Sequence, residues 1–312
     1  MKKIILSLLA IAAMTSCTKS SEEEIDPNAP VEIELTAGLL EAQSRAAIES
    51  NTVSGVSILR KDGADETNDW GTTVKTVDIT NSNDNIFDTN KEYYNPNATI
   101  HAYFLGYYPA GTVSGTGVDQ IVTFNPTLNN CSTDILYSPS VDLGTKGTPT
   151  SNAKLTFKHQ LARINFVFVK GNGYPSDDYI TSVKIKSIAL PKSMKLSDGS
   201  LTFGTEVTDG IEVLNNSDNT KFKIIEGAGT ATTAEQAAMI QPEKIITLDI
   251  TTNKGSFSNV AVKIGGNPLS DSNKIEAGKQ YTITITFSGK EAITTGTIEE
   301  WGTAINGSSD AQ

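Results

Sequence analysis

Short runs of alternating apolar and polar residues recur along the chain. The clearest run is Tyr281, Ile283, Ile285 and Phe287, where each apolar side chain is followed by Thr or Ser. A period of two places one face of a strand in a core and the other face in solvent. Comparable strands are predicted near residues 31–36, 53–59, 70–79, 100–109, 121–124, 134–137, 155–168, 183–190, 194–203, 246–250, 260–264 and 291–298. The pattern indicates an all-β fold.

One predicted strand changes face part-way along. Phe157 and Leu161 are apolar at odd positions, whereas Ala162 and Ile164 are apolar at even ones. A strand cannot change face without an extra residue, so we expect a bulge or kink near Leu161 and Ala162.

Turn signals divide the remaining runs. Asp198 and Gly199 predict a hairpin turn, and residues 231–239 predict one or two turns of helix. Residues 141–152 are rich in Gly, Pro and Thr, have no periodicity, and are the predicted domain boundary. The two groups of strands indicate two tandem β-sandwich domains, 31–150 and 151–312.

The N-terminal residues have the features of an export signal. Lys2 and Lys3 precede an apolar run of about ten residues, too short to span a membrane and typical of a signal peptide. Small residues and then Cys17 follow, an arrangement that resembles a bacterial lipobox. The resemblance implies a signal peptide at residues 1–16 and acyl chains, such as palmitate, anchored through Cys17. The alternative is a secreted protein with a coincidental cysteine.

Residues 17–30 contain three successive glutamates and little apolar surface, so we expect a flexible, solvated tether. Over the whole chain, Lys+Arg of 25 against Asp+Glu of 36 gives a net charge of −11. This balance argues against nucleic acid or an anionic membrane surface as a partner. Cys131 is the only other cysteine, which excludes a disulfide framework and favours a small buried hydrophobe at that position.

The sequence offers no catalytic or metal-binding pattern. His101 and His159 lie in separate apolar strands, and the spacings of zinc sites, nucleophile elbows and phosphate loops are not found. His159 shares the parity of Phe157, which favours a hydrogen-bonded core histidine over a catalytic one. The acidic residues at 62–69 lack calcium-loop spacing and favour a solvated loop. The aromatic run at 103–108 favours a core strand over a carbohydrate platform. We predict no enzyme, no cofactor and no metal.

Several motifs together resemble the fimbrillin family, the lipoprotein-derived subunits of Bacteroidales-type (type V) pili. They are Cys17, the N-terminal strand with an arginine after it, and the segments 102–109, 133–137, 155–162, 277–287 and 298–301. Leu105 and Gly106 interrupt the aromatic segment, where this chain departs from the family's motif.

The resemblance implies transthyretin-like, Greek-key sandwiches and a lipoprotein precursor that reaches the outer membrane. An arginine-specific protease would cut between Arg45 and Ala46. The cut would remove residues 31–45, and with them the strand that carries Val31, Ile33 and Leu35. A sandwich without one strand has an open apolar groove with unpaired backbone groups.

The resemblance also implies that a neighbouring subunit fills this groove by donor-strand exchange. The donor would be the C-terminal segment 291–312, with Ile293, Thr295, Ile298 and Trp301 as its contact residues. The expected partners are other pilus subunits, the arginine-specific protease, the outer membrane through the precursor's lipid, and surface glycans or proteins as adhesion targets. The expected location is the cell-surface fimbrium. The alternative is an uncut surface lipoprotein that anchors a pilus or binds glycan.

Overall fold

The computed structural model describes residues 29–39, 53–65, 69–71, 73–80, 84–124, 128, 131–233 and 236–301. Within these residues the regular structure consists of strands, with 3-10 geometry at η1 (Gly117–Asp119) and at Gln236, and no α-helix. The prediction of an all-β fold is therefore confirmed. The alternation of Ile, Val and Thr explains it, since these residues fit a pleated, half-buried surface.

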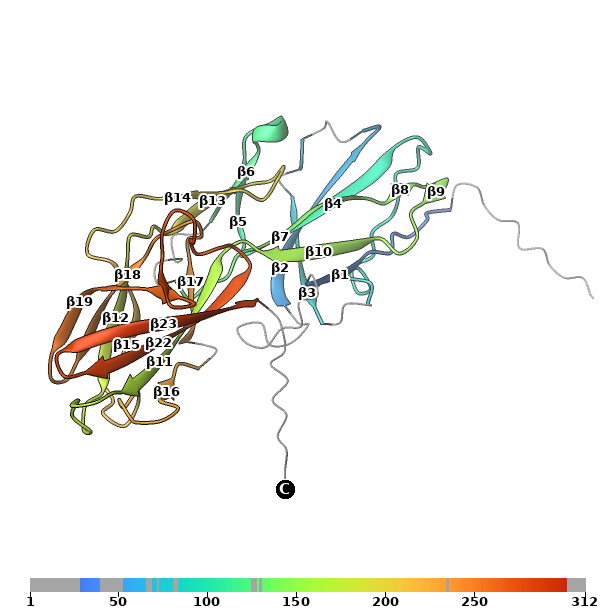
Figure 1. Ribbon diagram of the computed structural model, residues 1–312. Helices are drawn as coiled ribbons and strands as arrows, with labels where there is room; N and C mark the ends of the chain where they lie inside the picture. Colours follow the sequence, from blue (N-terminus) through green and yellow to red (C-terminus); the bar gives the residue numbers. More distant parts are fainter. Residues whose placement is uncertain are drawn as a thin grey trace, which may run out of the picture. The chain divides into compact units, whose positions relative to one another are not determined.

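The first sheet has six strands and holds the N-terminal strand at one edge (Figure 1). Its order is β1 (Thr36–Leu39), β10 (Lys154–His159), β7 (Leu136–Asp142), β4 (His101–Tyr108), β2 (Val53–Gly63) and β3 (Val74–Ile79). The pair β1–β10 is parallel, and the other neighbours are antiparallel.

The second sheet has seven strands and contains the C-terminal hairpin. Its order is β16 (Thr230–Ala231), β11 (Ala162–Lys170), β22 (Lys279–Ser288), β23 (Glu291–Glu300), β20 (Lys263–Ile264) and β21 (Asn267–Pro268), and β17 (Ala238–Ile240) also pairs with β11. The strands β11 and β22 run parallel, whereas β22 and β23 form an antiparallel hairpin.

Three smaller sheets complete the fold. One has the order β15 (Ile211–Asn215), β12 (Ile180–Lys186), β18 (Thr247–Thr252) and β19 (Ser256–Ala261). Another has the order β14 (Leu201–Phe203), β13 (Pro191–Lys195), β6 (Ile121–Phe124) and β5 (Gly111–Ser114). The last is the pair β8 (Gly144–Thr145) and β9 (Thr148–Pro149).

Buried side chains form three clusters. One is built from residues 33–157, and another almost wholly from residues 162–287. The third contains residues from both ranges, among them Tyr107 and Met194, and also Trp301. The pair β6–β13 also crosses the predicted boundary, and β8 and β9 lie inside residues 141–152. The division into domains 31–150 and 151–312 stays a prediction.

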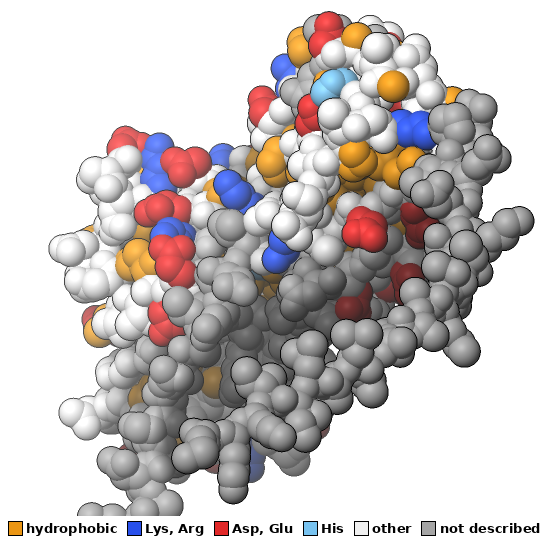
Figure 2. Space-filling view, turned by 90° about the vertical axis from the view of Figure 1, so that its right-hand side faces the viewer, with side chains coloured by type: hydrophobic (Ala, Val, Ile, Leu, Met, Phe, Trp, Pro, Cys, Tyr) orange, Lys and Arg blue, Asp and Glu red, His pale blue; other side chains and the backbone are white. Residues whose placement is uncertain are grey.

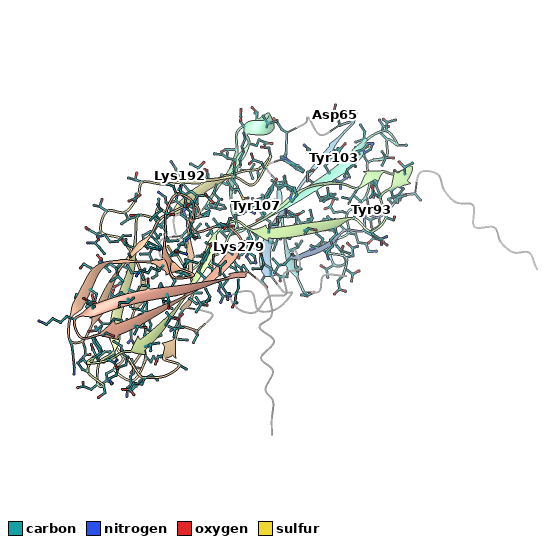
Figure 3. The ribbon with its side chains drawn as sticks, viewed as in Figure 1. Asp65, Tyr93, Tyr103, Tyr107, Lys192 and Lys279 are labelled. Carbon is teal, nitrogen blue, oxygen red and sulfur yellow. The ribbon has the colours of Figure 1, made fainter. Side chains whose placement is uncertain are left out.

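The aromatic strand β4 is core on both faces. Phe104 packs in the first of these clusters, while Tyr103 and Tyr107, labelled in Figure 3, pack in the third. The prediction of a core strand rather than a carbohydrate platform is confirmed. Gly106 makes room for Phe157, because a Cβ at Gly106 would lie 2.4 Å from the Phe157 ring. This contact explains a glycine inside an aromatic run.

The predicted face change near Leu161 is a complete break between two strands. β10 ends at His159 in the first sheet, and β11 begins at Ala162 in the second. Gln160 and Leu161 connect them, and Gln160 N–H donates to the carbonyl of Ile135. The break is larger than the bulge or kink that the sequence pattern suggested, because the two halves pair with different neighbours.

Two other local predictions have opposite outcomes. The hairpin at Asp198 and Gly199 is confirmed, since Met194 pairs with Leu201 and Gly199 has a φ of +76°. The predicted helix near residues 231–239 is wrong at both ends, because β16 includes Ala231 and β17 occupies Ala238–Ile240 and pairs with β11; Gln236 between them has 3-10 geometry. Ala and Met are good helix formers, but burial against β11 outweighs that intrinsic preference.

Candidate functional site

The N-terminal strand lies between two walls of backbone. Residues 31–35 bond to the first wall, at residues 85–94: Ile33 N–H donates to the Glu92 carbonyl at 2.8 Å, and Tyr94 N–H donates to the Val31 carbonyl at 3.0 Å. Ile86 N–H donates to the Leu35 carbonyl at 2.9 Å. The strand is therefore held along this wall by main-chain groups.

The second wall is β10. From Thr36 onward the strand changes partner, and Thr36 N–H and its hydroxyl both donate to the Ala153 carbonyl. The parallel register of β1 with β10 runs from Thr36 opposite Lys154 to Leu39 opposite Phe157 (Figure 1). The segment of residues 31–39 therefore links residues 85–94 to the six-stranded sheet.

The inward side chains of this segment are core residues. Ile33, Leu35 and Ala37 are each 0% exposed, while Glu34 is exposed on the other face. They pack in a cluster with large apolar side chains from both walls, from β4 and from β7 and the residue after it, including Phe87, Phe104, Leu136, Leu143, Leu155 and Phe157. Burying one Ile or Leu side chain contributes about 1.5–3 kcal/mol. A groove without these side chains would expose a contiguous apolar lining.

Charged side chains fix the first wall in place. Glu92 bonds Arg60 at 2.6 Å and Lys75 at 2.5 Å, and Arg60 also donates to the Tyr93 carbonyl. Burial alone would raise the pKa of the Glu92 carboxyl, but these hydrogen bonds outweigh burial and the pKa is lowered. The ammonium of Lys75 also lies over the Phe87 ring, 4.9 Å from its centroid. The wall is thus tied to β2 and β3 independently of the N-terminal strand.

The predicted donor segment lies in the chain's own second sheet. All ten residues of β23 pair with β22, from Glu291 opposite Ser288 to Glu300 opposite Lys279. Ile293 and Ile298 are 44% and 42% exposed, and Thr295 is also exposed. The structure therefore places the described part of this segment in a hairpin and not in a free tail. Residues 302–312 lie outside the described part.

Trp301 ends the described chain against the largely buried His159 and its partner Asp134. Its ring stacks on the His159 ring at a centroid distance of 3.8 Å, and His159 Nδ1 lies 2.6 Å from Asp134 Oδ2. The prediction of a hydrogen-bonded core histidine is confirmed. Sequence reasoning missed its two partners, because neither Asp134 nor Trp301 is close to His159 in sequence.

The other candidate groups have structural surroundings. His101 is partly exposed and pairs with Asp142 at 2.9 Å. Cys131 is buried, as predicted, and burial raises the pKa of its thiol to about 12. Within the described residues, no group of three or more His, Cys, Asp or Glu side chains is placed to hold a metal, and no helix is long and apolar enough to cross a membrane.

Three predicted sites lie outside the described residues: Cys17, Arg45 and Ala46. The face of the molecule seen in Figure 2 has small groups of hydrophobic side chains among charged and polar ones, where its residues are described. With residues 31–39 seated, the apolar lining of the groove is interior.

The Fimbrillin-like family model matches residues 42–301. The chain belongs to the fimbrillin-like family. This family is non-enzymatic, so the fimbrillin-like chain is not an enzyme. The match begins after the N-terminal strand and ends at the tryptophan that stacks on His159.

Two solved structures of Bacteroides cell adhesion proteins share the fold of this fimbrillin-like chain, and a third Bacteroides structure matches with a lower score. A putative cell adhesion protein from Bacteroides uniformis matches with a TM-score of 0.56 and 17% identity, over 87% of this chain and 99% of that one. A putative cell adhesion protein from Bacteroides eggerthii matches with a TM-score of 0.52 and 12% identity, over 88% and 98%. A fimbrial protein from Bacteroides vulgatus has a TM-score of 0.48 and 14% identity, over 86% and 99%. No curated protein matches the sequence.

Proposed function

We propose that the chain is a fimbrial subunit that polymerises by exchanging its N-terminal strand for a strand of another subunit. The observation that carries this proposal is the seating of residues 31–39. This segment fills a core with Ile33, Leu35 and Ala37, yet it precedes the region that the family model matches. Its removal would leave an apolar groove with unpaired backbone groups, which is costly in water.

The distribution of arginines supports a cut between Arg45 and Ala46. The sequence has three arginines, Arg45, Arg60 and Arg163. Arg60 lies in β2 and bonds Asp62 and Glu92, while Arg163 lies in β11 and is 1% exposed. Proteases act on exposed, extended loops rather than on paired strands. An arginine-specific protease therefore finds its one arginine outside the described strands at Arg45.

The composition of β23 supports the C-terminal segment 291–312 as the donor. The side chains on its inner face are small, since Ala292, Thr294 and Gly296 face the core. Its larger apolar residues, Ile293 and Ile298, are exposed. β23 therefore contributes few core side chains to its own sheet. The backbone bonds that it would lose on leaving β22 and β20 would be replaced in the groove of the next subunit.

The contacts in that groove are assigned to Ile293, Thr295, Ile298 and Trp301. Trp301 must leave His159 for the segment to extend, so this stacked pair opposes premature release. Ile293 and Ile298 lie on opposite faces of the strand, so the transfer buries one of these exposed isoleucines, which favours the exchange.

The route to the surface completes the proposal. Lipid on Cys17 anchors the precursor in the outer membrane, and the protease removes the lipid together with the N-terminal strand. The product joins a fimbrium that adheres to surface glycans or proteins. The fold of the cell adhesion proteins named above supports an adhesive role. The sheets are assigned to two transthyretin-like, Greek-key sandwiches, with the boundary at residues 141–152.

The experiment that tests the proposal is Arg45→Ala in the full chain. The variant is expected to stay a lipidated monomer, whereas the wild type gives a ladder of polymers on an unboiled denaturing gel. A ladder from the variant would overturn the proposed cut and exchange.

One observation favours a second function. β23 is paired along its whole length in its own sheet, which suits a protein that never donates a strand. Such a protein would be an uncut surface lipoprotein that anchors a pilus or binds glycan. Lipid still attached to Cys17 on the surface-exposed form, with the Arg45–Ala46 bond intact, would favour it.

A further inference from the structure

The side-chain amide of Asn85 bonds to the backbone of the N-terminal strand on either side of Glu34. Leu35 N–H donates to Asn85 Oδ1 at 3.2 Å, and Asn85 Nδ2 donates to the Ile33 carbonyl at 3.5 Å. The same Oδ1 accepts from Phe87 N–H at 3.1 Å, which holds the amide in this orientation. The amide thus serves a strand as the peptide group of a neighbouring strand would.

Most hydrogen bonds between the first wall and the strand do not depend on which side chains the strand carries. Ile86, Glu92 and Tyr94 bond the strand through their main chains. Any strand in the same register could make these bonds, because every residue but proline carries both groups. Asn85 is the side chain on this wall that bonds the strand's backbone at Ile33 and Leu35.

Lys91 adds a contact that does depend on side-chain identity. Its ammonium lies 2.6 Å from the carboxylate of Glu32, which stands between the inward residues Val31 and Ile33. The hydrogen bond to Glu32 raises the pKa of Lys91. Removal of the strand would leave this ammonium beside an empty groove.

We propose that Asn85 is a positioning residue that sets the register of any strand in the groove, and that Lys91 selects a strand with a carboxylate at the position of Glu32. This inference rests on the proposed strand exchange. The partner it defines is an extended segment with apolar side chains at alternate positions and an acidic residue between the first two of them. β23 has carboxylates at Glu291, Glu299 and Glu300, but Thr294, Thr295 and Gly296 interrupt its apolar positions, so a strand of a different pilus subunit fits this description better than β23 of a second copy.

The test uses the full chain cut by an arginine-specific protease at Arg45, which leaves the N-terminal strand bound but exchangeable. A fluorescent peptide of residues 31–39 is added, and its exchange rate and affinity are measured. A second peptide has an ester in place of the amide at Leu35, which removes that N–H without added bulk.

For wild type, the ester is expected to weaken binding about three- to tenfold, since it removes one hydrogen bond. Asn85→Ala should bind both peptides equally, whereas Asn85→Asp, which keeps the acceptor oxygen, should stay sensitive to the ester. Asn90→Ala, an exposed asparagine on the same segment, is the matched control and should behave as wild type. A variant that merely damages the fold would bind both peptides more weakly, but the difference in affinity between the amide and the ester peptide would remain. If the ester weakened binding to wild type and to Asn85→Ala by the same factor, the proposed role of Asn85 would be overturned.

Lys91→Glu tests the side-chain contact in the same assay. Lys91→Glu should bind the natural peptide about two- to fivefold more weakly than wild type does. It should recover affinity for a Glu32→Lys peptide, because the exposed ion pair is then restored with its charges exchanged. Unchanged preference between these two peptides would overturn the role of Lys91. If cut wild type neither releases its strand nor takes up peptide, the proposed function itself fails, and the roles of Asn85 and Lys91 fail with it.

Discussion

His159 and Trp301 stack with their ring centroids 3.8 Å apart and their planes 11° from parallel. This contact joins β10, whose residues 154–157 pair with the N-terminal strand, to the end of β23. One strand therefore contacts both the strand proposed to leave and the strand proposed to be donated.

Trp301→Ala should release the end of β23. We expect a loss of about 3–5 kcal/mol in the free energy of unfolding, as for other large buried aromatic side chains. Hydrogen exchange should rise first at the β23 amides near Glu299 and Glu300. Ile298→Ala, which truncates a 42% exposed side chain on the same strand, is the control and should change stability by about 0.5 kcal/mol or less. Unchanged exchange in β23 after Trp301→Ala would contradict the anchoring role.

Leu35→Ala should destabilise the uncut chain by about 2–5 kcal/mol, because it leaves a cavity in the core that Ile33 and Leu35 fill. Chemical denaturation of the full chain measures this. Glu34→Ala changes the adjacent, exposed residue and should cost about 0.5 kcal/mol or less. Equal effects of the two substitutions would mean that the strand is not seated as described.

Glu92 should make stability fall in acid. Its carboxyl has a lowered pKa in the folded chain: burial acts to raise it, and the hydrogen bonds from Lys75 and Arg60 outweigh burial. The stabilisation is therefore fully present above the ordinary glutamate pKa of about 4.3. It is lost as pH falls through the folded value.

Melting temperatures of wild type and Glu92→Gln measured from pH 7 to pH 3 check this expectation. The wild type should be the more stable at pH 7, and the difference should shrink below about pH 4. Glu34→Gln should show no such convergence with wild type. A difference that stays constant across the range would argue against the role of the Glu92 ion pairs.

Gly106→Ala should destabilise the chain by about 1–3 kcal/mol, because the new Cβ meets the Phe157 ring and forces the core to shift. Gly255→Ala adds the same methyl group where no atom lies within 4 Å, and should be nearly neutral. Thermal melting of both variants makes the comparison. A neutral Gly106→Ala would show that β4 and β10 pack less closely than described.

Strand identity was predictable where one face is buried and the other solvated. Tyr281, Ile283, Ile285 and Phe287 all lie in β22 and are buried, as their alternation predicts. Residues 238–240 were not predictable in this way, because their pairing with β11 is a tertiary interaction that local helix preference does not contain.

Strand partners were beyond the sequence pattern. Nothing in the alternation of residues 31–36 indicates that Thr36 onward runs parallel to β10, or that β6 pairs with β13. The roles of Asn85 and Asp134 were also hidden, since each acts through residues more than twenty positions away. Periodicity reports which face is buried, and long-range partners need the folded chain.

N-terminal sequencing of fimbriae sheared from the cell surface tests the central claim most directly. Cleavage and exchange predict that the subunits in the polymer begin at Ala46 and contain no peptide from residues 31–39. Subunits that begin at lipidated Cys17 and retain residues 31–39 would contradict it.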